Sequence, residues 1–236
     1  MDARFRPVFE AATRPYRAAG RYAWFAAKGK LRHDPVFHAL LRRGLLPDGG
    51  SLIDLGCGQG LLLSLLRAAR DQFAAGRWPA DWPAPPTRLS LRGVDAHAGR
   101  VQLARRVLNG GAQFEVRDLR EFDFPPCAAI VMLDVLLYLR EAQQESVLEK
   151  ATAALRSGGL LLLREPDADA GVALHLTKLS ARFEAALRGK LAQPLHCRSA
   201  ARWIADLSRR GFAVDATPMS QGTPFCNVLF VARKVV

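Results

Sequence analysis

The 236-residue chain lacks several features that would assign it to a common class. No uninterrupted apolar stretch reaches the roughly 18 residues that a membrane-spanning helix needs. The first residues show neither the apolar core nor the cleavage pattern of a secretory signal. The four cysteines form no C-x-x-C pair and no metal-ligand spacing with histidine. These absences predict a cytoplasmic protein with reduced thiols and no resident metal.

Motifs for other nucleotide or nucleic-acid proteins are also absent. The chain contains no G-x-x-x-x-G-K-[ST] loop, aromatic RNP motif, KH loop or zinc finger. Half of its residues are hydrophobic, which excludes disorder and favours a single α/β domain. The net charge of +12 comes mainly from arginine and is scattered along the chain. It has four open explanations: a nucleic acid, an anionic membrane, an acidic protein or biased composition.

The most informative segment that is present is the glycine-rich stretch 52–60, which reads LIDLGCGQG. A short apolar run containing Asp54 leads into glycines at positions 56, 58 and 60, and an apolar helical pattern begins at Leu61. This pattern predicts a buried strand, a tight turn that brings backbone close to a ligand, and a helix whose free N–H groups face that ligand. It indicates a nucleotide-cofactor cradle, although the spacing differs from the G-x-G-x-x-G of dinucleotide folds.

Acids follow three further strand patterns. The alternating run 89–95 ends at Asp95, where a carboxylate can accept two hydrogen bonds from a ribose diol. Asp118 ends the segment 113–119, and Asp134 lies in the apolar segment 128–139. Each acid also has a structural alternative. Asp54 would cap the turn, and Asp95 would be the N-cap of a helix over residues 96–108.

Together with an L-x-x-G-G turn ahead of a fifth strand, in residues 155–163, these segments resemble the successive motifs of class I S-adenosylmethionine-dependent methyltransferases. The resemblance covers residues 50–165. It implies an α/β fold with a Rossmann-like, doubly wound, seven-stranded sheet whose last strand is antiparallel, and S-adenosylmethionine as cofactor. In such enzymes the first acid lies near the amino-acid end of the cofactor, the second on the ribose and the third on the adenine amino group. The cofactor residues that the resemblance implies are Asp54, Gly56, Cys57, Gly58, Gly60, Asp95, Ala96, Asp118, Leu119 and Asp134.

The flanking segments are expected to determine the substrate. We expect a helical N-terminal lid (residues 1–48), a cofactor-binding core (49–165), a helical substrate-side insertion after the fifth strand (166–198) and a C-terminal part of the core (199–236). Two alternatives to a lid stay open: a basic amphipathic surface for a membrane or acidic partner, and helices that only cap the sheet. A loop with two tryptophans at residues 76–86 is expected at the opposite edge of the sheet, as local packing or a partner contact.

The chemistry of a sulfonium donor limits what the protein must supply. The donor carries its own leaving group, so the protein aligns an acceptor in line with the S–CH₃ bond, which is worth on the order of 7–11 kcal/mol. It excludes water and, where needed, accepts a proton through a base worth roughly 10²–10⁴-fold. That chemistry requires no metal. His175 and His196 are the candidate bases because they lie in the insertion, and the reaction can also run without a base.

The residues after the fourth strand narrow the chemical class of the methyl acceptor. Enzymes that methylate exocyclic base amines or glutamine amides carry [N/D]-P-P-[Y/F] there, whereas this chain reads DVLL at residues 134–137. The Pro126–Cys127 pair precedes the strand, at the wrong edge for the nucleophile of a cytosine-C5 enzyme. We therefore expect O-, N- or C-methylation of a small molecule, with an RNA methyltransferase and a non-catalytic cofactor-binding protein as alternatives.

The whole chain also loosely resembles methyltransferases of bacterial aryl-polyene and related pigment pathways. That resemblance implies an aryl or acyl acceptor carried by an acidic acyl carrier protein, which would explain the basic N-terminal segment. Nucleic acid is not an expected partner, and peripheral contact with a membrane stays open.

Overall fold

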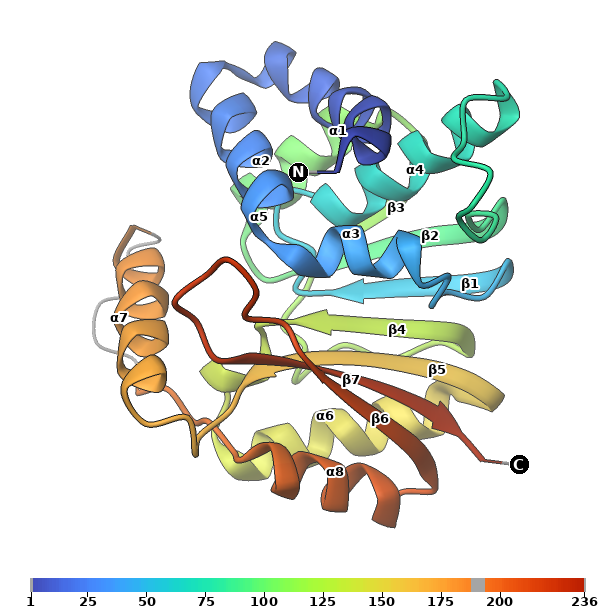
Figure 1. Ribbon diagram of the computed structural model, residues 1–236. Coiled ribbons are helices and arrows are strands. Elements are labelled where there is room, and N and C mark those ends of the chain that lie inside the picture. Colours follow the sequence, from blue (N-terminus) through green and yellow to red (C-terminus); the bar gives the residue numbers. More distant parts are fainter. Residues whose placement is uncertain (1, 188–193, 236) are drawn as a thin grey trace.

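A computed structural model describes residues 2–187 and 194–235, so residues 188–193 of the expected insertion lie outside the described residues. The core is a seven-stranded sheet of order β3-β2-β1-β4-β5-β7-β6 (Figure 1). This architecture confirms the expected doubly wound α/β fold. The strands are β1 (Gly49–Leu55), β2 (Arg88–Asp95), β3 (Gln113–Val116), β4 (Cys127–Leu133), β5 (Leu155–Pro166), β6 (Phe212–Pro218) and β7 (Asn227–Lys234).

The pairing of the strands locates the ligand-binding edge. Strands β1 to β5 are parallel to one another, and β7 is antiparallel to both β5 and β6. Strand β1 lies between β2 and β4, so the order of strands reverses there. In open α/β sheets, ligands bind outside the carboxyl ends of the strands at such a reversal. The glycine turn follows β1 at this point.

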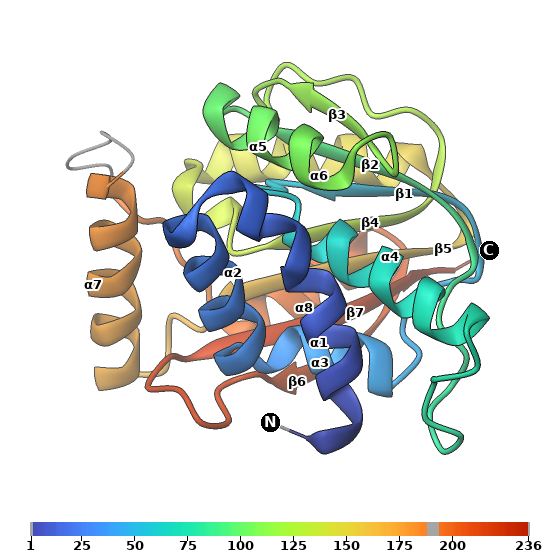
Figure 2. The same ribbon diagram turned by 90° about the horizontal axis from the view of Figure 1, so that it is seen from above.

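Helices cover both faces of the sheet, which explains why its central strands are apolar on both sides. One face carries α1 (Arg6–Thr13), α2 (Arg21–His33), α3 (Pro35–Arg42), α4 (Leu61–Ala74) and α5 (Ala98–Leu108). The other carries α6 (Glu141–Ala154) and α8 (Ala200–Arg209). Short 3-10 turns are η1 (Ala3–Phe5), η2 (Arg14–Ala19) and η3 (Leu136–Tyr138). Helix α7 (Val172–Leu187) stands at the carboxyl edge of the parallel strands (Figures 1 and 2).

The N-terminal helices form a packed layer. Val8, Phe9 and Ala12 of α1 are buried in the same core cluster as α4, and the Ser64 hydroxyl donates to the Ala12 carbonyl at 2.8 Å. Helix α2 ends at the carboxyl edge, where Lys30 reaches the residue after β4. Residues 2–48 therefore cover one face of the core and extend to the ligand-binding edge.

Two local expectations differ from the structure. Helix α5 begins at Ala98 with His97 as its N-cap, so the alternative of Asp95 as an N-cap was wrong. The glycines at 158 and 159 lie inside β5, where the register with β4 shifts. They mark an irregularity within the strand, whereas the sequence pattern suggested a turn ahead of it.

Of the two roles expected for the tryptophan loop, local packing or a partner contact, the structure shows packing. Trp82 is buried, and its ring meets those of Phe5, His38 and Trp78 at centroid distances of 6.5, 5.1 and 5.7 Å. The loop precedes β2, at the edge opposite the glycine turn (Figure 1). Across the described ranges, no helix has both the length and the apolar character required to cross a bilayer.

Candidate cofactor and acceptor site

In the turn after β1, two separate features require glycine at position 56: its backbone conformation and the space around it. Gly56 has a φ of 77°, and a Cβ there would lie 2.4 Å from a methyl carbon of Val135. Gly60 has a φ of 75° and starts α4 without a side-chain cap, which leaves the first N–H groups of the helix available. At Gly58 the nearest atom to a Cβ would be an Arg100 nitrogen at 3.9 Å. Backbone at this turn can therefore be approached closely by a ligand.

Asp95 joins the end of β2 to the glycine turn. One carboxylate oxygen accepts from the Gly58 N–H at 2.9 Å, and the other accepts from the His97 N–H at 2.8 Å. Ala96 lies within the small turn that the second bond closes. An ionised carboxylate has about four acceptor sites, so it can still receive hydroxyl groups from a ligand.

Asp54 is a buried carboxyl beside Asp95. Among the backbone and side-chain groups that the structure describes, no hydrogen-bond donor reaches its oxygens. Burial raises its pKa to about 8, and the negative charge of Asp95 adds to the shift. Burial also raises the pKa of the neighbouring Cys57 thiol, which stays neutral. A cationic ligand group is what such an unpartnered carboxyl would bind best.

Tyr16 supports the turn from the N-terminal layer, a contact that sequence reasoning missed. Its ring is fully buried, and its hydroxyl donates to the Gln59 carbonyl at 2.9 Å. Burial raises the pKa of this phenol. The partners are 43 positions apart, so no local pattern would have identified the pair. The residue lies in a segment noted only for its aromatics and cations.

Asp118 and Leu119 follow β3. The Asp118 carboxylate accepts from the Arg120 backbone N–H at 2.9 Å and from the Arg120 guanidinium at 2.9 and 2.6 Å. The Leu119 side chain is buried in the core cluster beneath α6. The structure thus places Asp118 at the edge shared by Asp54 and Asp95, with a guanidinium beside its oxygens.

Asp134 occupies a different environment. Its backbone has a φ of 59°, which is rare for a residue other than glycine. The Arg164 guanidinium donates to its carboxylate, once at 2.9 Å and once through a shorter contact, and the Lys30 ammonium lies 3.6 Å away. Arg164 also donates to Asp34, and it is only 1% exposed. The structure therefore gives this carboxylate cationic partners within the protein.

Lys30, Asp34, Asp134 and Arg164 form a group of paired charges, here called the Arg164 cluster. Burial alone would raise the pKa of Asp34, but Arg164 and Lys30 lower it to about 2. The same pairing raises the pKa of Arg164 against its burial. The Arg164 cluster ties the junction of α2 and α3 to the ends of β4 and β5, and sequence reasoning did not identify Arg164 or Asp34.

The two candidate bases lie in unequal positions. The backbone N–H of His196 donates to the Leu137 carbonyl at 2.8 Å, so this half-buried residue lies beside the turn after β4. His175 is exposed on α7, where its Nδ1 lies 3.2 Å from the Gly171 carbonyl oxygen. Only His196 is held against the carboxyl ends of the parallel strands.

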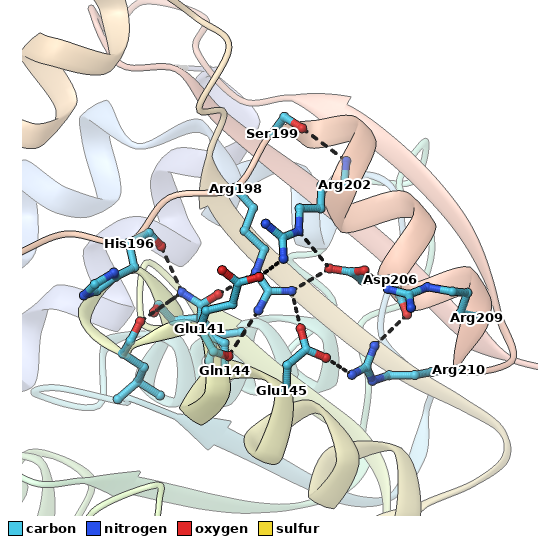
Figure 3. A network of polar contacts seen from close by, with 12 residues as sticks. Glu141, Gln144, Glu145, His196, Arg198, Ser199, Arg202, Asp206, Arg209 and Arg210 are labelled. Atoms are coloured by element: carbon cyan, nitrogen blue, oxygen red, sulfur yellow. Dashed lines mark hydrogen bonds and ion pairs between the residues drawn. The ribbon is translucent and has the colours of Figure 1, made fainter.

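A buried network, shown in Figure 3, holds His196 in place. The Gln144 amide donates to the His196 carbonyl at 2.9 Å, and Arg198 donates to the Gln144 amide oxygen at 2.7 Å. Arg198 also pairs with Glu145 and Asp206, each at 2.5 Å. This network connects the end of the insertion to α6 and α8, and it was not predicted. Where the structure describes the chain, no group of three or more histidine, cysteine, aspartate or glutamate side chains is placed to hold a metal ion.

Comparisons with known proteins agree with this geometry. A family model described as a methyltransferase domain matches residues 28–217. A carboxy-S-adenosyl-L-methionine synthase from Chromohalobacter salexigens is 31% identical over 122 residues, which are 50% of this chain and 40% of that protein. The chain thus spans less than half the length of this curated relative.

Solved structures share the fold at low sequence identity. A S-adenosylmethionine-dependent methyltransferase from Methanosarcina mazei aligns with a TM-score of 0.59 and 17% identity, covering 86% of this chain and 98% of the other. A chain from the complex of the Haloferax volcanii Trm112 methyltransferase activator with a putative methyltransferase aligns with a TM-score of 0.63 and 18% identity, covering 89% and 93%.

The residues fit the cofactor that this family uses. The open backbone at Gly58 admits a ligand, the spare acceptor sites of Asp95 suit a ribose diol, and the unpartnered Asp54 suits an ammonium group. The family match covers most of the chain, and the sheet order and the glycine turn agree with it. The chain belongs to the methyltransferase domain family, and it has the fold of S-adenosylmethionine-dependent methyltransferases.

Proposed function

We propose that this enzyme methylates an apolar small molecule, an aryl or acyl compound, by in-line displacement. The observation that carries the proposal is the number of exposed apolar side chains on α2 and α7, the two helices that reach the carboxyl edge. Of nine large apolar side chains exposed among the described residues, five lie on α2 and α7. They are Tyr22 (77% exposed), Phe25 (55%), Val172 (78%), Leu176 (45%) and Leu179 (67%). Apolar side chains gathered at a site mark binding of an apolar ligand or partner.

The proposed role of each acid in cofactor binding depends on how many of its oxygen lone pairs are free to accept hydrogen bonds. In this proposal Asp95 receives the ribose hydroxyls and Asp54 receives the ammonium of the methionine part. The turn of Gly56, Cys57, Gly58 and Gly60 supplies close backbone, and Ala96 lies beside the ribose. Asp118 and Leu119 border the adenine. Asp134 contributes by shaping the turn after β4, because Arg164 engages its carboxylate.

Bound S-adenosylmethionine supplies an activated methyl group. The chain's own task is to align the acceptor, exclude water and accept a proton. We assign the role of proton acceptor to His196 in preference to His175. Hydrogen bonds from its backbone N–H and to its backbone carbonyl hold His196 beside the turn after β4. A His196→Ala variant should lower kcat by roughly 10²–10⁴-fold while S-adenosylhomocysteine affinity stays unchanged. An unchanged kcat would show that the reaction needs no base.

The basic face of η2 and α2 supports an acidic carrier protein as the partner that delivers the acceptor. Arg14, Arg17, Arg21 and Arg32 are exposed, and no acidic residue lies between Ala11 and His33. Charge complementarity of this kind raises association rates and makes binding sensitive to salt. An Arg14→Glu/Arg21→Glu variant should lose affinity for an acidic acyl carrier protein, with Arg106→Glu on α5 as the control. Binding to RNA or to anionic vesicles, with none to the carrier, would contradict this partner.

Similarity to carboxy-S-adenosyl-L-methionine synthase supports a second candidate, in which a carbon of the cofactor loses a proton and forms a C–C bond to the carboxyl group released by a carboxylic-acid co-substrate, which takes up a proton in its place. Mass spectrometry separates the two. Incubation with S-adenosylmethionine and a panel of phenols, acids and carrier-bound acyl chains should give a methylated acceptor and S-adenosylhomocysteine. A carboxylated cofactor without a methylated acceptor would favour the second candidate. Absence of S-adenosylhomocysteine binding by calorimetry would remove both.

A further inference from the structure

Glu165, the residue that follows Arg164 in β5, is a buried carboxyl with an unusual set of donors. One of its oxygens accepts from the Val135 N–H at 3.1 Å and the Leu136 N–H at 2.7 Å. The other accepts from the Leu137 N–H at 3.1 Å. Its relative exposure is 1%. Three successive backbone N–H groups of the turn after β4 therefore converge on one side chain from the adjacent strand.

Val135, the first of these three residues, contacts the glycine turn after β1. A Cβ at Gly56 would lie 2.4, 3.3 and 3.4 Å from the three carbons of the Val135 side chain, so Val135 packs directly against this glycine. The position of the Gly56 backbone thus depends on the position of Val135. Glu165 fixes the latter through the Val135 N–H.

The carbonyl side of the same turn is held separately. The Gln144 amide donates to the Leu136 carbonyl at 2.9 Å and to the Leu139 carbonyl at 3.1 Å. The His196 N–H donates to the Leu137 carbonyl. Because these contacts act on carbonyl groups, they cannot replace Glu165 as acceptors. Removing the Glu165 side chain would leave three buried N–H groups without their acceptor, which is costly in a folded protein.

We propose that Glu165 is a positioning residue for cofactor binding, which acts by holding Val135 against Gly56. It touches neither the cofactor nor the acceptor in this role. It acts through two contacts, from its carboxylate to the turn after β4 and from Val135 to the glycine turn. The proposal rests on the assignment of the glycine turn to the cofactor and is independent of the acceptor.

Two substitutions of Glu165 have different expected results. In Glu165→Ala all three N–H groups lose their acceptor. In Glu165→Gln the amide oxygen can still accept from Val135 and Leu136, so only the bond to Leu137 is lost. Hydrogen exchange followed residue by residue should therefore accelerate at all three amides in Glu165→Ala and at Leu137 alone in Glu165→Gln. S-adenosylhomocysteine affinity, measured by calorimetry, should fall about tenfold in Glu165→Ala and stay close to the wild-type value in Glu165→Gln.

Val135→Ala tests the second contact without touching the first. It should weaken S-adenosylhomocysteine binding while exchange at Val135, Leu136 and Leu137 stays slow. Val147→Ala, at a buried position of α6, is the control for loss of stability and should bind S-adenosylhomocysteine normally. If Glu165→Ala does not fold, Glu165→Gln and Val135→Ala still carry the test.

The proposal is overturned if Glu165→Ala and Val135→Ala bind S-adenosylhomocysteine as tightly as Val147→Ala, or if Glu165→Gln speeds exchange at all three amides alike. A wild-type protein that binds no S-adenosylhomocysteine would instead refute the cofactor assignment, so the two failures are distinguishable.

Discussion

Two pairs of carboxyl groups at the same edge of the sheet have opposite surroundings. From the part of the chain that the structure describes, Asp54 and Asp95, at the ends of β1 and β2, accept two hydrogen bonds between them, both at Asp95. Asp134 and Glu165, at the ends of β4 and β5, are engaged by a guanidinium and by three backbone N–H groups. The first pair has free acceptor sites for a ligand, and the second is used by the fold. We therefore expect an acid at a strand end to contact a ligand only where the protein leaves its oxygens available.

The largest expected effect comes from breaking the second pair. Arg164→Met removes the buried guanidinium shared by Asp34 and Asp134 and leaves two partly buried carboxylates without it. The free energy of unfolding, measured by urea denaturation, should fall by about 3–5 kcal/mol. Arg120→Met, which breaks a more exposed pair with Asp118, should cost less than about 1 kcal/mol. Equal losses would show that the Arg164 cluster is not a buried structural unit.

The next effect comes from removing a carboxylate of the first pair. Asp95→Asn loses charge-assisted acceptor sites for the ribose, so S-adenosylhomocysteine should bind about 100-fold more weakly in calorimetry. Asp118→Asn should cost about tenfold or less, because Arg120 already engages its oxygens. A larger loss at Asp118 than at Asp95 would reverse the proposed division of the site.

A smaller expected effect is the release of a proton from Asp54 when the ligand binds. Burial holds the pKa of Asp54 near 8, so at pH 7 the free protein carries this carboxyl mostly protonated. Binding of the ammonium group should favour the ionised form and release up to about one proton. Calorimetry of S-adenosylhomocysteine in buffers of different ionisation enthalpy should detect the release at pH 7. Methylthioadenosine, which lacks the amino-acid part, serves as the control and should release none. Equal release by both ligands would contradict an ammonium contact at Asp54.

The same shift has a consequence for stability. The folded pKa of Asp54 lies above its ordinary value of 3.8, so protonation favours the folded state. This contribution is present at low pH and is lost as the pH rises from about 4 through about 8. Asp54→Asn should therefore flatten the fall in stability over this window, as measured by urea denaturation at several pH values. An unaltered pH profile would show that Asp54 does not titrate there.

The fold and the first pair of acids could be predicted from the sequence because their signals are local. The glycines of the turn lie within nine residues, and Asp95 ends a strand of alternating pattern. The first five strands followed from such patterns, and the antiparallel last strand followed from the resemblance to the methyltransferase family. The shift inside β5 did not, because the register between two strands depends on both of them.

The partners of Arg164 and Arg198 could not be predicted from the sequence, and the reason is physical. Arg164 pairs with Asp34 across 130 positions, and Arg198 reaches Gln144 across 54. Such partners are selected by the packed fold, and nothing in the local sequence encodes them. One signal was present: Arg164 and Glu165 directly follow a run of four leucines. Charged residues that continue a buried strand must have partners, since unpaired burial is too costly.

The central claim is that the first pair of carboxyl groups binds the cofactor while the second pair maintains the fold. It is tested most directly by measuring S-adenosylhomocysteine affinity and unfolding free energy on the same two variants, Asp95→Asn and Asp134→Asn. Asp95→Asn should lose about 100-fold in affinity with little loss of stability, whereas Asp134→Asn should lose about 3 kcal/mol of stability and keep its affinity. Loss of affinity in Asp134→Asn at unchanged stability would contradict the account.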